Sequence, residues 1–491
     1  MTVQILIILL YFAVTVAIGL LAMKRSKTSN AFAGAGLGVI AVVCASTGEW
    51  LGGTATTGVS EYGFDVGISG SWYTIANGLG VIFLALLFAK LYRSLETVTV
   101  PGIIGHFIGR RARTVSSIFL IFVMLAVGIS QMIAAGSLGV SLIGLDFNVS
   151  VIGFAIVFIV YTLAGGMQAV AYTNVMHLIC MYGGVVLAII LSLKKVGGMG
   201  ALTQTLPESY FSMTSIGMPK VSSWVVASLL GACTAQAGVQ PILAAKDVNV
   251  AKKGAIITAF IAAPFGIFTA LLGMIAKSMS INGQLIGVTG QNVTNGKLAL
   301  PTLMLRLSPV AGGIVLASIL AAVLSTVSPI ILASGTMLTK DLYQGVIDPD
   351  ADDKKLMTMS RITTAASGII CSAAAIIFNT TGIRVLDIVY FAYSMRGSLF
   401  VIVLLGIYWK KISERGAIYG MICTSFVGLF WVTFNAVAGH FPIRGVTETY
   451  ISVVTALVST VIFSIAGRRS IIGDHELPAT INNSKTQEKN K

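Results

Sequence analysis

Thirteen long apolar stretches run through nearly the whole chain, and they restrict what it can fold into. About 20 apolar residues cross a bilayer as a helix, because hydrocarbon offers no partner for an unbonded backbone group. The chain is 56% hydrophobic and 10% charged, which excludes a soluble globular protein. We therefore predict an all-α polytopic membrane protein with thirteen transmembrane helices. The predicted spans are residues 3–23, 36–58, 66–89, 115–143, 149–165, 175–193, 223–245, 254–276, 309–337, 359–378, 385–408, 416–438 and 450–467.

Basic residues are concentrated in alternate loops. Across thirteen spans, most of the 32 Lys and Arg residues fall on one side, among them Arg110, Arg111 and Arg113. Positively charged loops stay cytoplasmic, so we predict that the N-terminus faces out and the C-terminus faces in. The formal net charge of +14 then reflects a rim that faces anionic lipid, and it requires no nucleic acid.

We predict one transmembrane domain, residues 1–472, followed by a disordered cytoplasmic tail, residues 473–491. Metal-ligand spacing, a Ser/His/Asp set and a phosphate-binding loop are all missing from the sequence, so we do not expect an enzyme. The expected partners are a small-molecule substrate and the lipid bilayer of a cell membrane, of the bacterial inner-membrane type. The sequence indicates no soluble protein partner.

Two adjacent hydroxyls, Ser325 and Thr326, lie in the middle of an apolar helix. Neighbouring residues on a helix point about 100° apart, so both hydroxyls can converge only on something beside the helix. A hydroxyl without a partner is costly in hydrocarbon. Two interpretations are open. The hydroxyls bond back to carbonyls one turn earlier, or they are ligands of a small hard cation such as sodium.

Small and polar residues interrupt two of the predicted spans. Residues 46–54 interrupt the second span, and residues 231–241 interrupt the seventh. Corresponding weak helices in two halves of a transporter indicate its binding site, because an unwound helix frees carbonyls and amides that a ligand or a buried partner must satisfy. The alternative is that the glycines serve only as packing faces.

Three motifs are similar to those of a known family. Residues 161–174 resemble its Gly-Gly…Ala-Val…Thr-Asp loop, residues 325–343 its ion-site helix, and residues 406–417 its Gly-Leu-Tyr-Trp-Lys-Arg…Gly-Ala segment. Through them the chain resembles the sodium:solute symporters along nearly its whole length. Residues 50–58 are most similar to the branch that includes the high-affinity choline transporter. Choline itself is not expected, because Gln131 and Gln236 stand where choline carriers have tryptophan, and a quaternary ammonium requires aromatic faces.

The resemblance implies the leucine-transporter fold. Its two inverted five-helix repeats would be residues 36–193 and 223–408, with an extra N-terminal helix at 3–23 and C-terminal helices at 416–467. It also implies a sodium site between the first broken helix and the helix of Ser325, with sodium as the co-transported ion and no other metal. The implied ligands are the carbonyls of Val42, Ala45 and Ala322 and the hydroxyls of Ser325 and Thr326.

Three residues depart from the family's pattern. Ser328 stands where relatives often have Asp, which leaves a second sodium site without its carboxylate. In the loop motif, Asn174 replaces Asp and His177 replaces the following Gln. The carboxylate near the inward path of the ion is therefore absent, and we expect sodium release to be tuned differently.

Two charged residues, Glu49 and Arg396, lie inside predicted spans, where charges are expensive and mark pathways. In one interpretation they are structural: the two charges form an ion pair that holds a gate, or Arg396 bonds carbonyls of a broken helix. In the other, Arg396 binds a substrate carboxylate and Glu49 meets a cationic group or carries a proton. Both charges together suit a zwitterion such as an amino acid, and Arg396 alone suits a monocarboxylate. Further candidate substrate contacts are Trp50, Tyr73, Asn77, Gln131, Gln236 and Gln240.

We therefore predict a sodium-coupled secondary active transporter that imports a small polar organic solute. One alternative is a proton-coupled carrier that uses Glu49 or His177. A second alternative is a transporter-like protein that senses its solute.

Overall fold

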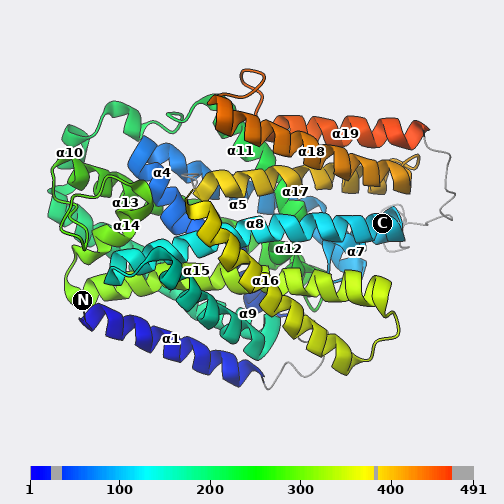
Figure 1. Ribbon diagram of the computed structural model, residues 1–491, viewed down its shortest axis with the longest axis horizontal. Coiled ribbons are helices and arrows are strands. Elements are labelled where there is room, and N and C mark those ends of the chain that lie inside the picture. The colour runs from blue at the N-terminus through cyan, green and yellow to red at the C-terminus, as the bar shows by residue number, and fades with distance from the viewer. Residues whose placement is uncertain (1, 24–35, 381–384, 467–491) are drawn as a thin grey trace, which may run out of the picture.

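The computed structural model describes residues 2–23, 36–380 and 385–466, and helices make up most of it (Figure 1). Within those ranges the chain forms no strand, only two isolated bridges. The predicted tail, residues 473–491, lies outside the described residues. The long helices that coincide with predicted spans are α1 (Thr2–Met23), α5 (Trp72–Leu87), α8 (Arg110–Ile143), α9 (Phe147–Val196), α13 (Val248–Ile281), α15 (Pro309–Met337), α16 (Asp353–Asn379), α17 (Val385–Tyr408), α18 (Glu414–Ala438) and α19 (Glu448–Ala466).

Two predicted spans are broken helices. The first consists of α3 (Val39–Trp50), a π-helical turn η1 (Thr54–Gly58) and α4 (Val59–Val66). The second consists of α11 (Met218–Gly231), a 3-10 turn η4 (Ala232–Thr234) and α12 (Gln236–Leu243), and it bends by 44°. Both interruptions lie inside the residue ranges that the sequence indicated.

Shorter elements connect the long ones. They are η2 (Gly67–Ser71), α6 (Ala89–Ser94), α7 (Val100–Phe107), α10 (Gly198–Thr205), η3 (Glu208–Phe211), α14 (Gly296–Leu305) and η5 (Leu338–Ile347). In the described part of the chain, nine helices are long and apolar enough to span a bilayer, or ten if the bent pair counts as one span. The remaining predicted spans coincide with shorter apolar helices, Val3–Ile18, Val39–Trp50 and Phe147–Leu163.

Helix α9 turns back on itself. A straight helix of 50 residues would measure about 75 Å, far more than a bilayer. The hydroxyls of Tyr161 and Thr173 contact each other, although twelve residues of straight helix rise about 18 Å. The chain therefore reverses between these two residues, as expected if α9 contains two of the predicted spans.

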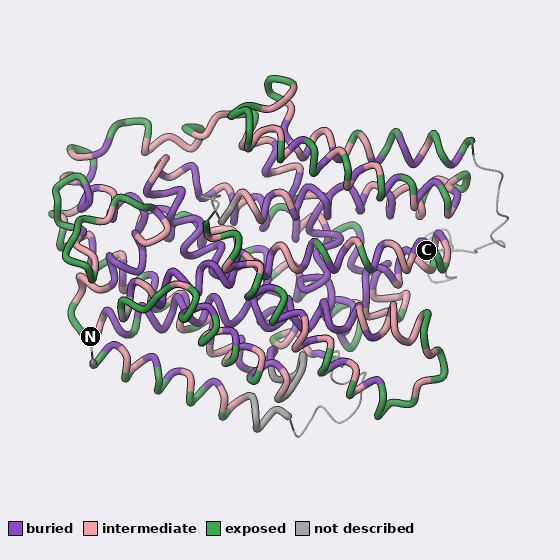
Figure 2. The backbone as a smooth tube through the Cα atoms, viewed as in Figure 1, coloured by how far each residue is buried: buried purple, intermediate pink, exposed green. Residues whose placement is uncertain are grey.

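Helix α15 is the centre of the bundle. From Val315 to Met337 every residue is buried, and the sequence there is rich in Ala, Ser and Gly, which let neighbouring helices approach closely. It continues without interruption into the π-helical turns of η5. Figure 2 shows the buried backbone concentrated in the middle of the molecule, while α1, α18 and α19 at the periphery carry many exposed residues.

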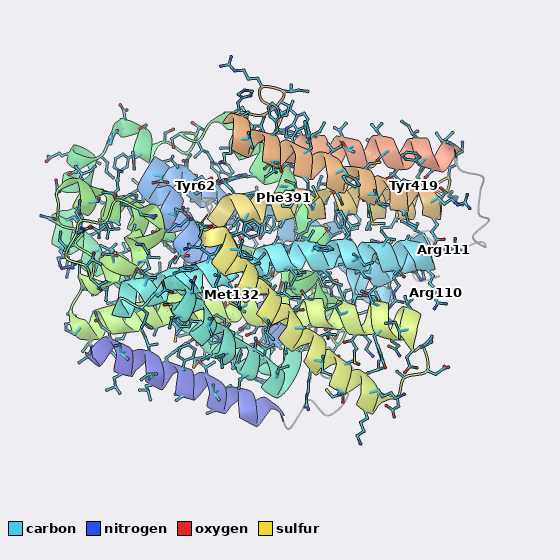
Figure 3. All side chains as sticks on the ribbon, in the orientation of Figure 1. Tyr62, Arg110, Arg111, Met132, Phe391 and Tyr419 are labelled. Carbon is cyan, nitrogen blue, oxygen red and sulfur yellow. The ribbon has the colours of Figure 1, made fainter. Side chains whose placement is uncertain are left out.

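The start of α8, with its run of arginines, lies at one end of the bundle, which we call the basic end. Arg110 and Arg111 lie there, at the start of α8 (Figure 3). Arg110 donates to the carbonyl of Gly345 at 2.6 Å, so the end of η5 lies at this end too. At the opposite end, Lys220 pairs with Asp387 at 3.3 Å. Two of the loops predicted to share the cytoplasmic side, residues 90–114 and 338–358, thus meet at this end of the described bundle.

Candidate functional site

The first break lies directly against two other helices. Helix α3 ends at Trp50, and a side chain at Gly52 would overlap the hydroxyl of Thr326 on α15. A Cβ at Gly53 would lie 2.9 Å from Oε1 of Gln131 on α8. The glycines of the break are therefore required so that α3 can leave its helical path between α15 and α8.

The two broken helices contact each other. The hydroxyl of Ser46 on α3 donates to the carbonyl of Gly238 on α12 at 3.0 Å. The ring of Trp50 packs on the same glycine, where a Cβ would lie 2.8 Å from Cζ2 of the indole. The breaks that the sequence indicated separately thus lie together in one region near the middle of the bundle, and a binding site between them stays a prediction.

The two hydroxyls of α15 behave differently from each other. Ser325 bonds back to the carbonyl of Ala322 at 2.9 Å, as the local interpretation expected. Thr326 reaches across to α3 and donates to the carbonyl of Gly48. From α9, Asn174 donates to the carbonyls of Cys44 on α3 (3.1 Å) and Ser325 on α15 (3.4 Å). Neutral oxygens from three helix segments therefore converge here.

Val42 and Ala45 are buried on the same helix α3. Gly48 lies against α15, and the carbonyl of Cys44, one turn earlier, accepts from Asn174 of α9. The side chain of Val42 packs on Gly254 of α13 instead. Coordination of sodium by Val42 and Ala45 stays a prediction, and the carbonyl of Cys44 is a further candidate.

Glu49 and Arg396 form an ion pair. Nη2 of Arg396 lies 2.8 Å from Oε1 of Glu49, and neither side chain is exposed. The guanidinium also lies over the ring of Tyr393, with 4.9 Å between its central carbon and the ring centroid. Within the described residues, Nε and Nη1 of Arg396, Oε2 of Glu49 and the indole nitrogen of Trp50 have no hydrogen-bond partner. The structure therefore shows the ion-pair arrangement while leaving polar atoms available to a ligand.

Aromatic side chains connect this pair with the end opposite the basic end. Trp224 stacks on Tyr390 with 4.3 Å between ring centroids, and the hydroxyls of Tyr73 and Tyr393 are 3.1 Å apart. Lys220 caps the set through its ion pair with Asp387 and its bond to the hydroxyl of Tyr62 at 2.8 Å. We call the set the aromatic column; its members are Tyr62, Tyr73, Trp224, Tyr390 and Tyr393.

The other predicted contacts are divided between two regions. Asn77 accepts from Ser228 at 3.1 Å beside the aromatic column, and Gln131 donates to Thr54 next to the first break. Gln236 instead accepts from the amide of Val100 at 2.7 Å and donates to the carbonyl of Val98 at 3.1 Å. Gln240 lies beside it, with 3.3 Å between the two side-chain amides. Both glutamines thus face the basic end, and their substrate contact stays a prediction.

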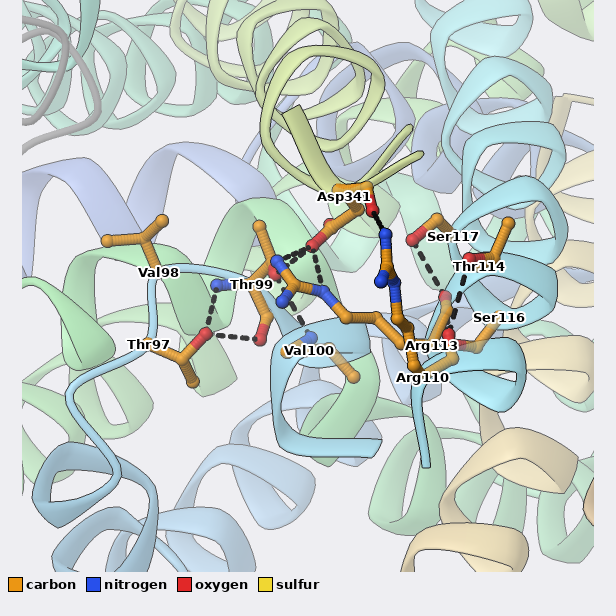
Figure 4. A network of polar contacts seen from close by, with 12 residues as sticks. Thr97, Val98, Thr99, Val100, Arg110, Arg113, Thr114, Ser116, Ser117 and Asp341 are labelled. Carbon is orange, nitrogen blue, oxygen red and sulfur yellow. Dashed lines mark hydrogen bonds and ion pairs between the residues drawn. The ribbon is translucent and has the colours of Figure 1, made fainter. Parts of the chain in front are cut away.

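A buried carboxylate joins η5, the loop before α7 and the start of α8 at the basic end. Oδ1 of Asp341, in η5, accepts from Nε and Nη2 of Arg113 at 2.8 and 2.6 Å and from Thr99 at 3.1 Å (Figure 4). Thr99 lies between the two backbone groups that Gln236 holds. Our sequence reasoning missed this network, although an aspartate that directly follows an apolar helix was a usable signal.

Helix α1 contacts α9 next to Asn174, near the region where α3 meets α15. The hydroxyl of Tyr11 contacts Nδ1 of His177, one turn after Asn174. A histidine near the end of a membrane span normally lies at the membrane–water interface, whereas His177 is fully buried. Tyr11 was also missed, because a tyrosine inside an apolar span carries no pattern that names its partner.

A model of the sodium:solute symporter family matches residues 31–424. The chain belongs to this family. It is 24% identical over 461 residues to a sodium/glucose cotransporter of Vibrio parahaemolyticus, an alignment that covers 87% of this chain and 84% of that protein. It is 25% identical over 500 residues to the osmoregulated proline transporter OpuE of Bacillus subtilis (strain 168), covering 97% and 98%.

Among solved structures, a Na⁺-coupled sialic acid symporter in a substrate-bound outward-open state has a TM-score of 0.76 at 19% identity, covering 94% of this chain and 97% of that chain. This likeness supports the predicted fold. The family confirms the predicted function: the protein is a sodium-coupled symporter of a small solute in a cell membrane. Its relatives are transporters rather than enzymes.

Proposed function

We propose that this symporter imports a small zwitterion, such as an amino acid, and that Arg396 and Glu49 bind its two charges. The observation that supports this proposal is the fully buried ion pair between α3 and α17. Buried polar atoms in proteins are nearly always hydrogen-bonded, yet Nε and Nη1 of Arg396 and Oε2 of Glu49 have no such bond among the described residues.

A zwitterion suits both members of the pair. Its carboxylate accepts from the planar guanidinium, and its ammonium faces Glu49, so each buried charge keeps an opposite charge when the pair separates. Trp50 and Tyr393 add aromatic walls on either side. A monocarboxylate would engage Arg396 and leave Glu49 without a counter-charge, which is costly in a dry site.

We propose that sodium binds between α3 and α15. The hydroxyls of Ser325 and Thr326 and the carbonyl of Ala322 would be ligands, joined by carbonyls of α3 at Val42, Ala45 or Cys44. All of these groups are neutral oxygens, so no carboxylate has to lose its water. Sodium would join α3 to α15 beside Glu49, and each ligand would therefore bind better when the other is present.

The proposed topology has thirteen spans, with the N-terminus outside and the basic end in the cytoplasm. The solute would enter along the aromatic column and leave past Gln236, Thr99 and Asp341. Labelling from outside should then reach a cysteine at Lys220 but not one at Arg110. The reverse result would invert the orientation.

Uptake into proteoliposomes tests the function. An inward sodium gradient should drive uptake of an amino acid, with no uptake in potassium, and S325A/T326A should abolish the sodium dependence. R396Q should abolish uptake, whereas R361Q, at an exposed arginine of α16, should not. Sodium-independent uptake that a protonophore stops would favour the proton-coupled alternative. Unchanged uptake by R396Q would refute the assigned substrate site.

A further inference from the structure

The side chain of Asn174 lies in the seam between α3 and α15. Its Nδ2 atom is 3.1 Å from the carbonyl oxygen of Cys44 on α3 and 3.4 Å from that of Ser325 on α15. Carbonyl oxygens only accept, so the amide nitrogen must face them, and each of its two N–H groups has its own acceptor. One side chain from a third helix, α9, therefore joins the two helices.

The seam around this amide is tightly packed. Asn174 is 2% exposed. A side chain at Gly48 would overlap both Nδ2 of Asn174 and the carbonyl oxygen of Ser325. Water has little access to these bonds, and hydrogen bonds are stronger in such a low-dielectric place.

The part of α9 that carries Asn174 is anchored by contacts of the neighbouring residues. One turn later on α9, His177 contacts the hydroxyl of Tyr11 on α1. On the other side, the neighbouring residue Thr173 contacts Tyr161 in the first limb of α9. If α3 moves away from α15, the amide cannot follow α3, because its own helix is fixed to α1 and to itself.

Electrostatics suggests what the amide does. A sodium ion in the seam would attract oxygens of both helices. The two N–H groups of Asn174 also present partial positive charge to one oxygen on each helix, and they are a permanent part of the chain. We propose that Asn174 is a positioning residue that holds α3 against α15 whether or not sodium is bound. This inference rests on the proposed sodium site.

Two consequences follow for sodium binding. A ligand shifts a conformational equilibrium only by the difference in its affinity for the two states. If Asn174 already holds α3 against α15 in most molecules, sodium can increase the closed fraction only slightly. The site is also preorganised, which increases the apparent affinity for sodium in proportion to the fraction of closed molecules.

The native Cys44 reports on the seam, because it is buried in α3 and its own carbonyl accepts from Asn174. We would replace the other four cysteines with alanine in the full chain, reconstitute it in liposomes and measure the rate at which N-ethylmaleimide labels Cys44. With Asn174 present, the rates in sodium and in potassium should differ by less than about threefold, since the amide already holds most molecules closed. Each of its two bonds should contribute about a factor of five to this closure.

N174L keeps the branched shape and removes both donors. In potassium we expect Cys44 of this variant to be labelled about 25-fold faster, because each of the two lost bonds contributes about a factor of five and the factors multiply. Saturating sodium should restore the slow rate, which also shows that the variant is folded. The matched control is T258V, which removes a bond from α13 to the carbonyl of Val43 on the same helix and should leave both rates unchanged.

Labelling of N174L at the parent rate in potassium would overturn the proposal. Loss of all sodium protection in N174L would overturn it too, because Asn174 would then be a sodium ligand rather than a tether. A different result would refute the proposed sodium site: sodium would still protect Cys44 in the triple variant N174L/S325A/T326A. In that case the comparison of N174L with its parent in potassium would still decide the role of the amide.

Discussion

The ion pair between Glu49 and Arg396 allows a quantitative test of the central site. Its nitrogen and oxygen are 2.8 Å apart, and neither side chain is exposed. At an effective dielectric constant of about 20, two unit charges at that separation attract each other by about 6 kcal/mol. Dehydration of the two ions offsets much of this attraction. Removing one partner should therefore be more damaging than removing both.

We expect E49Q and R396M each to lower the free energy of unfolding by about 3–5 kcal/mol, because each leaves one buried charge alone. The double variant should be more stable than the sum of the two losses by at least about 3 kcal/mol. Denaturant titration of the purified protein in detergent measures all four forms.

The matched control is the pair of Lys220 and Asp387, which is 3.3 Å apart and more than a third exposed on both sides. Its coupling energy, from K220M, D387N and their combination, should stay below about 1 kcal/mol. Additive losses at Glu49 and Arg396, or single losses below about 1 kcal/mol, would refute the reasoning.

Three further predictions concern the regions around this pair. G48A should abolish sodium-coupled uptake because its methyl group would overlap backbone of α15, whereas G153A, with open space around it, should transport normally. D341N should increase labelling of a V98C reporter from the cytoplasmic side by about tenfold, since charged hydrogen bonds contribute about 1.5–3 kcal/mol; an unchanged rate would contradict the role of Asp341 in closing the basic end. Y11F should lower the free energy of unfolding by about 1–3 kcal/mol, because the buried His177 loses its contact; an effect no larger than that of Y408F, at an exposed tyrosine, would contradict it.

The sequence predicted the helical segments and both breaks because these depend on local composition. Apolar length fixes where a chain can cross a bilayer, and clustered Gly and polar residues mark where a helix opens. Glu49 and Arg396 were recognised by the same logic, because charges inside apolar segments need a reason. Their pairing was one of several alternatives, and only the packing of α3 against its neighbours favours it in this conformation.

Side-chain directions near a break could not be predicted. Gln236 is the first residue of α12, directly after Ala235 leaves the helical region at φ −70° and ψ 87°. The period of 3.6 residues does not continue across such a point, so the sequence cannot tell whether Gln236 faces the solute or the loop at Val98. Contacts between distant residues carry no sequence signal of their own: the unusual position of Asp341 was visible, but its partner Arg113 was not.

The aromatic column was partly predictable from the sequence. Tyr390, Tyr393 and Arg396 are spaced by three residues on α17, which places them near one face of the helix. That spacing was visible in the sequence. The partners Tyr62 and Trp224 come from two other helices, and only the fold brings them to the same place.

The pairing of Glu49 with Arg396 also constrains how the protein is made. The two residues are 396 − 49 = 347 positions apart in the chain. At a synthesis rate of about 5–20 residues per second, α3 emerges from the ribosome roughly 17–70 seconds before the arginine exists. During that interval the carboxylate has no opposite charge waiting in the hydrocarbon. We therefore expect helix α3 to stay with the insertion machinery or at the membrane surface, and to take its final place only when α17 arrives.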